Sequence, residues 1–457
     1  MSAPEDAGGR IERFFGVRAA GSTFRREVLG GLTTFLTMAY ILAVNPVFLA
    51  AAGMPRDGAV LATAVAAGLA TAAMGLFANL PVALAPGMGL NAFFAYTICL
   101  GHEVPWQAGL GLLLLVSLVF LALTAGRVRE LITAAVPPAL RFAAAVGIGL
   151  FISMIGLQHA GVVAPHPATY VTLGDLGAPH ARLALAGLAV TLFLAARKVR
   201  TAIFWGMVIT AGLAAWSGLL RLPSGAWVEV PRGRLPGLEM DIAGALDPAL
   251  LPAAVALLFF AVFDALGTLY AVGAEAGLLD AEGKFPRLGR ALAVDAGGAV
   301  AGALLGTSSV TCYIESATGV GVGARTGLAS LVTAACFGVS LFFLPLVLAV
   351  SAGVTVGSGP AAHTYYPLTA SALVVVGVLM ARSVARIEWG DITEAVPAFL
   401  TLSVMPATFN ISHGLAAGFV SYSCMKLAAG RRREAHWLVH VLAALFAWRY
   451  LALPGEH

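Results

Sequence analysis

Stretches of about twenty apolar residues recur along most of this chain, and they constrain its fold more than any other feature. A helix of about twenty residues spans the hydrocarbon core of a bilayer. Hydrophobic residues make up 59% of the 457 positions and charged residues only 11%, a balance that excludes an ordinary soluble domain. The sequence therefore predicts an all-α polytopic membrane protein.

The apolar stretches divide into about fourteen membrane elements. Two of these, the third and the tenth, are interrupted. The other twelve have continuous helical sequence, near residues 28–52, 58–79, 107–125, 142–158, 183–196, 201–220, 249–275, 291–305, 327–349, 368–381, 395–408 and 411–427. A last apolar stretch, 436–453, fits either a surface helix or a fifteenth span.

The tenth element is the stretch GTSSVTCYIESATGVGVG, residues 306–323, which opens with hydroxyl side chains and holds four glycines and Glu315. Irregular backbone is tolerated at membrane depth only where protein covers it or where it lines a wet cavity. A carboxylate at that depth costs about 2.5–3.5 kcal/mol on insertion scales and marks a functional site. A Gly-rich packing seam is the alternative, for which Glu315 is an unusual residue.

The third element, residues 81–101, is interrupted in the same way. It contains Pro81, Pro86, Gly87 and Gly89 in an otherwise apolar sequence. We expect an extended stretch that leads into a half-helix starting near Gly89. Paired broken helices are typical of the midplane binding site of a transporter.

The distribution of basic residues predicts the topology. Connectors after elements 4, 6, 8, 10, 12 and 14 are basic, and the positive-inside rule places these loops and the N-terminus in the cytoplasm. The broken elements are then seven apart, and an odd number of spans inverts the second copy of a repeat. The sequence predicts a 7+7 inverted-repeat fold in the cell inner (plasma) membrane.

Three acids lie inside predicted spans: Asp264, Asp295 and Glu315. We expect Asp264 and Glu315 to face a common cavity, whereas Asp295 has either a functional or a purely structural role. Carboxylates beside half-helix N-termini accept hydrogen bonds from a polar ligand, and the free backbone N–H groups donate to it. Burial disfavours the charged form of a carboxyl group, which makes all three acids candidates for proton coupling.

Other functional classes find no support in the sequence. Catalytic and nucleotide-binding motifs are absent, so the chain is not expected to be an enzyme or to hold a cofactor. The four cysteines (Cys99, Cys312, Cys336 and Cys424) are scattered, which predicts no metal site and no disulfide framework. The net charge of +4 comes from basic residues that cluster in short loops between spans, so it does not indicate a nucleic-acid partner. An anion or other small-solute transporter on the same fold is the main alternative, although it should lack these acids. An intramembrane enzyme or a channel would need a catalytic constellation or a pore motif.

Four segments resemble those of one known family. They are LTTFLTMAYILAVNP (32–46), APGMGLNAFFAY (85–96), FDALGTLYAVG (263–273) and GTSSVTCYIESATGVGVGARTGL (306–328). In this order they resemble the AzgA-like purine permeases, which belong with the nucleobase–ascorbate transporters, including the uracil permeases. The resemblance covers nearly the whole chain. It implies proton-coupled uptake of adenine, guanine or hypoxanthine by an elevator-type alternating-access mechanism.

The resemblance also implies a core domain and a gate domain. With the pattern above it divides the chain into a cytoplasmic tail (1–27), two core parts (28–125 and 249–349), two gate parts (126–220 and 350–430), an extracytoplasmic loop (221–248) and a C-terminal basic segment with an apolar helix (431–457). A homodimer is expected only by analogy with other proteins of this fold.

The family's substrate-binding positions match particular residues here. Asp264 and Glu315 match the acid on the eighth element and the residue on the tenth half-helix that hold the base. Tyr313 matches an aromatic residue ahead of the second position, and Thr268 a substrate-facing position one turn after the first acid. Backbone groups near Phe93, Phe94 and Ile314 are expected to complete the site. The expected partners are a purine nucleobase, protons and the lipid bilayer.

Overall fold

A computed structural model describes residues 9–125, 137–223, 225–229, 233–280, 285–357 and 362–452. Within these ranges, nine helical segments are long and apolar enough to cross a membrane. Five further elements (α5 with η2, α10, α13, α17 and α18) complete a series of fourteen. This confirms the predicted all-α polytopic membrane fold. The first eight residues of the expected tail and the expected boundary at residue 126 lie outside the described ranges.

The first half of the chain contains seven elements in sequence order. Its segments are α1 (Arg10–Phe15), α2 (Phe24–Met38), α3 (Ile41–Ala51), α4 (Arg56–Ala73), η1 (Met74–Ala78), β1 (Leu84–Pro86), α5 (Met88–Ala92), η2 (Phe93–Leu100), α6 (Trp106–Ala125), α8 (Pro138–His159), β2 (Val163–His166), β3 (Tyr170–Leu173), α9 (Pro179–Ala196) and α10 (Ala202–Trp216). The short helix α5 continues directly into the π-helical segment η2.

The second half repeats this order and adds one helix. Its segments are η3 (Pro236–Glu239), η4 (Gly244–Leu246), η5 (Pro248–Leu250), α11 (Leu251–Glu275), α12 (Leu288–Leu305), β4 (Val310–Cys312), α13 (Ser316–Val322), α14 (Gly327–Ser340), η6 (Leu341–Phe343), α15 (Leu344–Ser351), β5 (Val354–Val356), β6 (His363–Tyr365), α16 (Pro367–Ala381), η8 (Arg382–Arg386), α17 (Ile392–Ala407), α18 (Ile411–Ala428), η9 (Arg432–Glu434) and α19 (Trp437–Ala452). In both halves the third element is a short strand followed by a short helix, and seven elements separate the two, as the 7+7 inverted repeat requires.

The first span differs in one respect from its expected form. The stretch 28–52 is not a single helix, because α2 ends at Met38 and α3 begins at Ile41. Pro46 lies inside α3 without ending it. The interruption falls instead at Ala39 and Tyr40, which is where Tyr40 makes a long-range contact.

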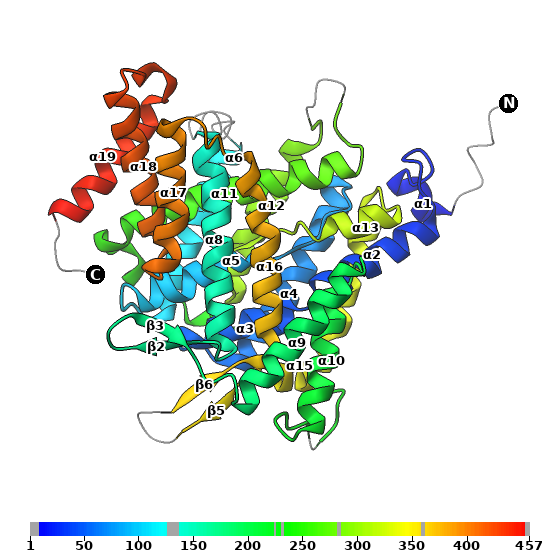
Figure 1. Ribbon diagram of the computed structural model, residues 1–457. Coiled ribbons are helices and arrows are strands. Elements are labelled where there is room, and N and C mark those ends of the chain that lie inside the picture. The colour runs from blue at the N-terminus through cyan, green and yellow to red at the C-terminus, as the bar shows by residue number, and fades with distance from the viewer. Residues whose placement is uncertain are drawn as a thin grey trace.

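Two groups of helices account for most of the packing. In the first group, α2 packs on α13 and α14, and α12 packs on α4 and α6. In the second, α8 packs on α16 and α17, α17 packs on α18, and α9 packs on α10 and α16. The hairpins β2–β3 and β5–β6 lie together at the lower end of the molecule in Figure 1, and the two chain termini lie on opposite sides. Neither hairpin was expected from the sequence.

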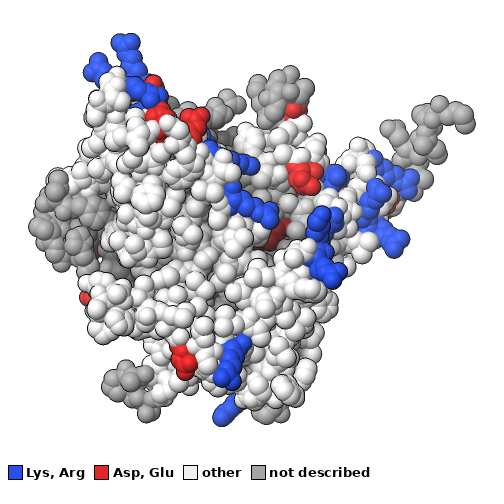
Figure 2. Space-filling model, viewed as in Figure 1, with Lys and Arg blue, Asp and Glu red and all other residues white. Residues whose placement is uncertain are grey.

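Charged side chains are sparse on the face of the molecule in Figure 2. Lys and Arg gather mainly in the upper half and along the right edge, and uncharged side chains cover most of the surface between them. Large apolar side chains such as Leu69, Phe193 and Trp216 are exposed. Such a surface suits hydrocarbon rather than water.

A cluster of charged residues attaches the C-terminal segment to the second group of helices. The Lys426 side chain is buried on α18, and its Nζ lies 2.8 Å from Glu394 of α17 and 3.1 Å from Glu434 of η9. Arg431 lies 2.7 Å from both Asp391 and Glu434. The cluster therefore connects α17, α18 and the turn that leads into α19.

Asp391 also caps the N-terminus of α17. Its carboxylate accepts hydrogen bonds from the N–H group and the hydroxyl of Thr393. These bonds, together with Arg431, lower the pKa of Asp391 to about 2. A carboxyl group with a lowered pKa stabilises the fold fully above its ordinary pKa of about 3.9, and this contribution is lost as the pH falls through about 2. The cap is therefore intact at neutral pH.

Replacing Lys426 by Ala is expected to lower the melting temperature of the purified protein. The substitution leaves Glu394 without its cation in a mostly buried position, at a cost of about 3 kcal/mol, the lower end of the range for a broken buried pair. Arg432→Ala is the matched control, because Arg432 is exposed in η9. Equal melting temperatures for the two variants would contradict this role of Lys426.

Candidate functional site

The two broken elements contact each other directly through their backbones. Strands β1 and β4 pair in antiparallel fashion, with Leu84 opposite Cys312 and Pro86 opposite Val310. Two more hydrogen bonds extend the pairing: the Gly87 N–H group donates to the Ser309 carbonyl (3.0 Å), and the Tyr313 N–H group donates to the Ala83 carbonyl (2.9 Å). Both strands are completely buried. The N-terminal ends of α5 and α13 therefore lie at the two ends of these paired strands, inside the protein.

Glycines permit the close packing at the start of α5. A Cβ atom on Gly87 would lie 2.7 Å from the Thr311 side chain, and one on Gly89 would overlap the Phe260 ring. The first N–H groups of a helix have no intrahelical acceptor, and here they belong to Met88, Gly89 and Leu90. This helix start offers hydrogen-bond donors at the centre of the fold.

Glu315 lies between β4 and α13 and is buried, with 7% of its surface exposed. The Tyr40 hydroxyl donates to its Oε1 atom at 2.6 Å, and Tyr40 is itself 1% exposed. Sequence reasoning missed Tyr40. The available signal was a tyrosine inside an apolar span, because a buried Tyr hydroxyl usually needs a partner.

Asp295 and Asp264 both lie near the Thr311 side chain. The Asp295 Oδ1 atom accepts hydrogen bonds from the Cys312 N–H group (2.8 Å) and the Thr311 hydroxyl (3.3 Å), so Asp295 holds strand β4 in place. Asp264, on α11, also interacts with the Thr311 hydroxyl and with the charges of Asp295 and Glu315. The three acids are thus near neighbours; Asp295 and Glu315 are buried, and Asp264 is partly exposed.

The other predicted site residues occupy different environments. Tyr313 is buried and its hydroxyl donates to the Pro86 carbonyl, which ties the start of α13 to the end of β1. Thr268 is 9% exposed one turn after Asp264, and the Ile314 side chain is 44% exposed. Phe93 and Phe94 are fully buried in the apolar core, within η2 and beyond the first turn of the half-helix. The structure brings Asp264, Glu315 and Tyr313 together, whereas Phe93 and Phe94 lie farther along the helix than the free N–H groups.

Further polar side chains connect the residues just before β4 to neighbouring helices. The Ser308 hydroxyl donates to the Asn91 side chain. The Asn45 amide donates to the hydroxyls of Thr63 (2.7 Å) and Thr307 (2.8 Å). These contacts link the half-helix and the first two spans to the segment before β4.

Replacing Tyr40 by Phe is expected to reduce transport about tenfold while the protein remains folded. The change removes only the hydroxyl that orients Glu315, and hydrogen bonds to charged groups contribute about 1.5–3 kcal/mol. The measurement is the initial rate of solute uptake by the variant, compared with that of the wild type at the same expression level. Tyr270→Phe, on the exposed side of α11, is the matched control. Unchanged uptake by Tyr40→Phe would exclude a role for this hydroxyl.

The fold and the site together define a class of protein. Fourteen elements in two inverted repeats, with two broken helices that meet beside buried acids, are the architecture of a membrane transporter. The Permease family (Xan_ur_permease) matches residues 25–416, and the chain belongs to this family.

Curated relatives match over nearly the whole chain. Putative permease MJ0326 of Methanocaldococcus jannaschii is 46% identical over 97% of this chain and 99% of its own length. Adenine permease AdeP of Escherichia coli is 41% identical over 98% and 97% of the two chains. Guanine/hypoxanthine permease PbuG of Bacillus subtilis is 39% identical over 97% and 100%. These relatives confirm the resemblance that the four motifs indicated.

Solved structures with low sequence identity share the fold. The transmembrane domain of the cyanobacterial bicarbonate transporter BicA superposes with a TM-score of 0.61 at 16% identity, over 86% of this chain and 97% of that one. The murine anion transporter Slc26a9 in its inward-facing state superposes with a TM-score of 0.62 at 11% identity, over 94% and 74%. At such identities the likeness concerns architecture alone.

Proposed function

We propose that this protein carries purine nucleobases, namely adenine, guanine or hypoxanthine, into the cell across the inner (plasma) membrane. Relatives of 39–41% identity that are named adenine and guanine/hypoxanthine permeases support this substrate class. The observation that carries the proposal is the buried Glu315, oriented by Tyr40 at the start of one half-helix and close to Asp264.

In this proposal the base binds at the junction of the two half-helices. Glu315 and Asp264 accept hydrogen bonds from N–H groups of the purine, and backbone N–H groups donate to its carbonyl or ring nitrogen atoms. The residues proposed to contact the substrate are Asp264, Glu315, Thr268, Tyr313, Ile314, Phe93 and Phe94, the last three through backbone groups.

Uptake is proposed to be coupled to protons through the same acids. Three carboxyl groups lie near one another, those of Asp295 and Glu315 buried and that of Asp264 partly exposed. Like charges at short range oppose simultaneous ionisation, so a proton on one of them relieves the repulsion. Two donors already hold the Asp295 carboxylate against β4, which makes Asp264 and Glu315 the stronger candidates for the coupled proton.

Alternating access is proposed to be of the elevator type. The first packing group, with α2 to α6 and α11 to α15, acts as the core that carries the site, and the second group, with α8 to α10 and α16 to α18, acts as the gate. The separation of contacts into these groups supports the division. We further propose that the N-terminus is cytoplasmic and that the gate provides the contacts of a homodimer.

An anion transporter is the second candidate, because BicA and Slc26a9 share the fold. Buried carboxylates repel an anion, however, and the relatives of higher identity carry names of nucleobase permeases. These observations favour a neutral purine.

The test is uptake of radiolabelled adenine, guanine and hypoxanthine in cells that lack their own purine permeases. Saturable uptake that a protonophore abolishes would support the proposal and rank the substrates. Labelled sulfate and bicarbonate serve as the anion controls. Transport of either anion without transport of any purine would overturn the assignment.

A further inference from the structure

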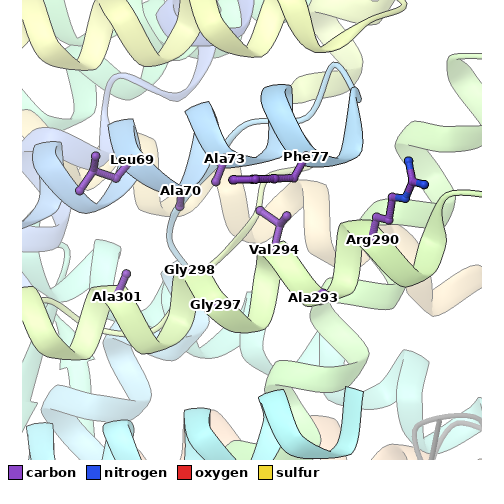
Figure 3. Close-up of a pocket in the computed structure, with 10 residues that line it drawn as sticks. All are labelled: Leu69, Ala70, Ala73, Phe77, Arg290, Ala293, Val294, Gly297, Gly298 and Ala301. Atoms are coloured by element: carbon purple, nitrogen blue, oxygen red, sulfur yellow. The ribbon is translucent and has the colours of Figure 1, made fainter. Parts of the chain in front are cut away.

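A groove of about 630 Å³ runs along the outside of the first packing group, between α4 with η1 and α12. Figure 3 shows its lining residues on the two neighbouring helices. They are Leu69, Ala70, Ala73, Phe77, Arg290, Ala293, Val294, Gly297, Gly298 and Ala301. None of these residues belongs to the candidate substrate site, so the groove is a separate feature of the surface.

The chemistry of the groove suits an apolar chain rather than a purine. Nine of its ten lining residues are apolar or glycine, and Arg290 provides the only charged side chain. Leu69 and Phe77 are 58% and 69% exposed, so the groove opens to the side of the molecule where lipid lies. Small residues on α12 keep it open: a Cβ atom on Gly297 would meet no atom within 4 Å.

The length of the groove matches one leaflet of a bilayer. Arg290 and Ala301 mark its two ends on α12, and eleven helical steps of 1.5 Å give about 16 Å. Half of a hydrocarbon core of about 30 Å is about 15 Å. Arg290 near the start of α12 then lies at the level of the lipid headgroups, where a charged side chain is tolerated.

Arg290 has no acidic partner among the described residues, although neighbouring Arg287 donates to the Asn79 carbonyl. An unpaired cation at the end of an apolar groove complements a lipid phosphate. We propose that the groove binds one acyl chain of an anionic phospholipid, whose phosphate pairs with Arg290. This groove is separate from the proposed substrate site, because none of its lining residues is among those proposed to contact the purine.

The experiment compares lipid binding to the full chain by native mass spectrometry. Delipidated protein is incubated with phosphatidylglycerol or with phosphatidylcholine, and the lipids retained per chain are counted. Gly297→Leu places a bulky side chain in the groove, at a position where a Cβ atom meets no atom within 4 Å. Gly338→Leu is its control, because a Cβ atom on this exposed helical glycine also meets nothing within 4 Å. Arg290→Gln removes the charge, and Arg432→Gln is its control.

The wild type and both controls are expected to retain one more lipid molecule per chain after incubation with phosphatidylglycerol than after incubation with phosphatidylcholine. Gly297→Leu should lose this tightly held lipid, and Arg290→Gln should bind the two lipids equally. Equal retention of both lipids by the wild type, or full retention of phosphatidylglycerol by Gly297→Leu, would overturn the proposal. A change of oligomeric state in Gly297→Leu would overturn it as well, since the groove would then be a contact between two copies of the chain.

Discussion

Replacing Glu315 by Gln is expected to reduce purine uptake about 100-fold without unfolding the protein. The amide keeps the size of the side chain and can still accept a hydrogen bond from Tyr40. It loses the negative charge, and a hydrogen bond to a charged group is stronger than a neutral one by roughly 1–2 kcal/mol. It also cannot take part in proton uptake. Loss of both contributions accounts for the size of the expected effect.

The measurement is the initial rate of labelled purine uptake at matched expression, together with binding of purine to the purified variant. Glu239→Gln is the matched control, because Glu239 is exposed in η3. If Glu315→Gln takes up purine at the wild-type rate, Glu315 is not part of the substrate site, although the protein still transports purines. That outcome would leave the substrate assignment intact and require another residue to hold the base.

Asp264→Asn is expected to abolish accumulation of purine against a gradient while leaving slower exchange. Its charge interacts with those of Asp295 and Glu315, so an uncharged side chain changes how the whole cluster binds a proton. Loss of a charge-assisted hydrogen bond to the purine should weaken binding about 10- to 100-fold. Exchange of internal for external purine does not need net proton movement and should persist at high substrate concentration.

Two assays separate these effects: protonophore-sensitive accumulation in cells and counterflow in proteoliposomes. Glu275→Gln, an exposed acid at the end of the same helix, is the control. If Asp264→Asn accumulated purine as the wild type does, Asp264 would not take part in coupling. If it lost counterflow at every substrate concentration, its role would be in binding alone.

The acids and the helix interruptions were predictable from sequence because charged residues, Pro and Gly are unusual within an apolar membrane span. Glu315 and Asp264 are costly in an apolar span, and Pro86 followed by Gly87 strongly disfavours a continuous helix. These are local signals. They locate the two broken elements correctly and predict the inverted relation between them.

The contacts between the broken elements were not predictable in the same way. Tyr40 lies 275 residues from Glu315 along the chain, and no local pattern connects them. The register of β1 and β4 depends on three residues in each strand, which is too short for a recognisable alternation. The hairpins β2–β3 and β5–β6 were missed for a similar reason, because each strand has at most four residues in a polar loop.

The pairing of β1 with β4 also limits whether this chain can be split into two half-length fragments. Each strand comes from a different half of the chain and satisfies part of its backbone on the other, whereas Leu84 also bonds to Thr71 and Cys312 to Asp295 in its own half. A half-length fragment would leave that strand unpaired in hydrocarbon, where each unsatisfied group costs several kcal/mol. Such a fragment could persist only beside a copy inserted in the opposite orientation. The junction that holds the site is therefore also what makes the two halves inseparable.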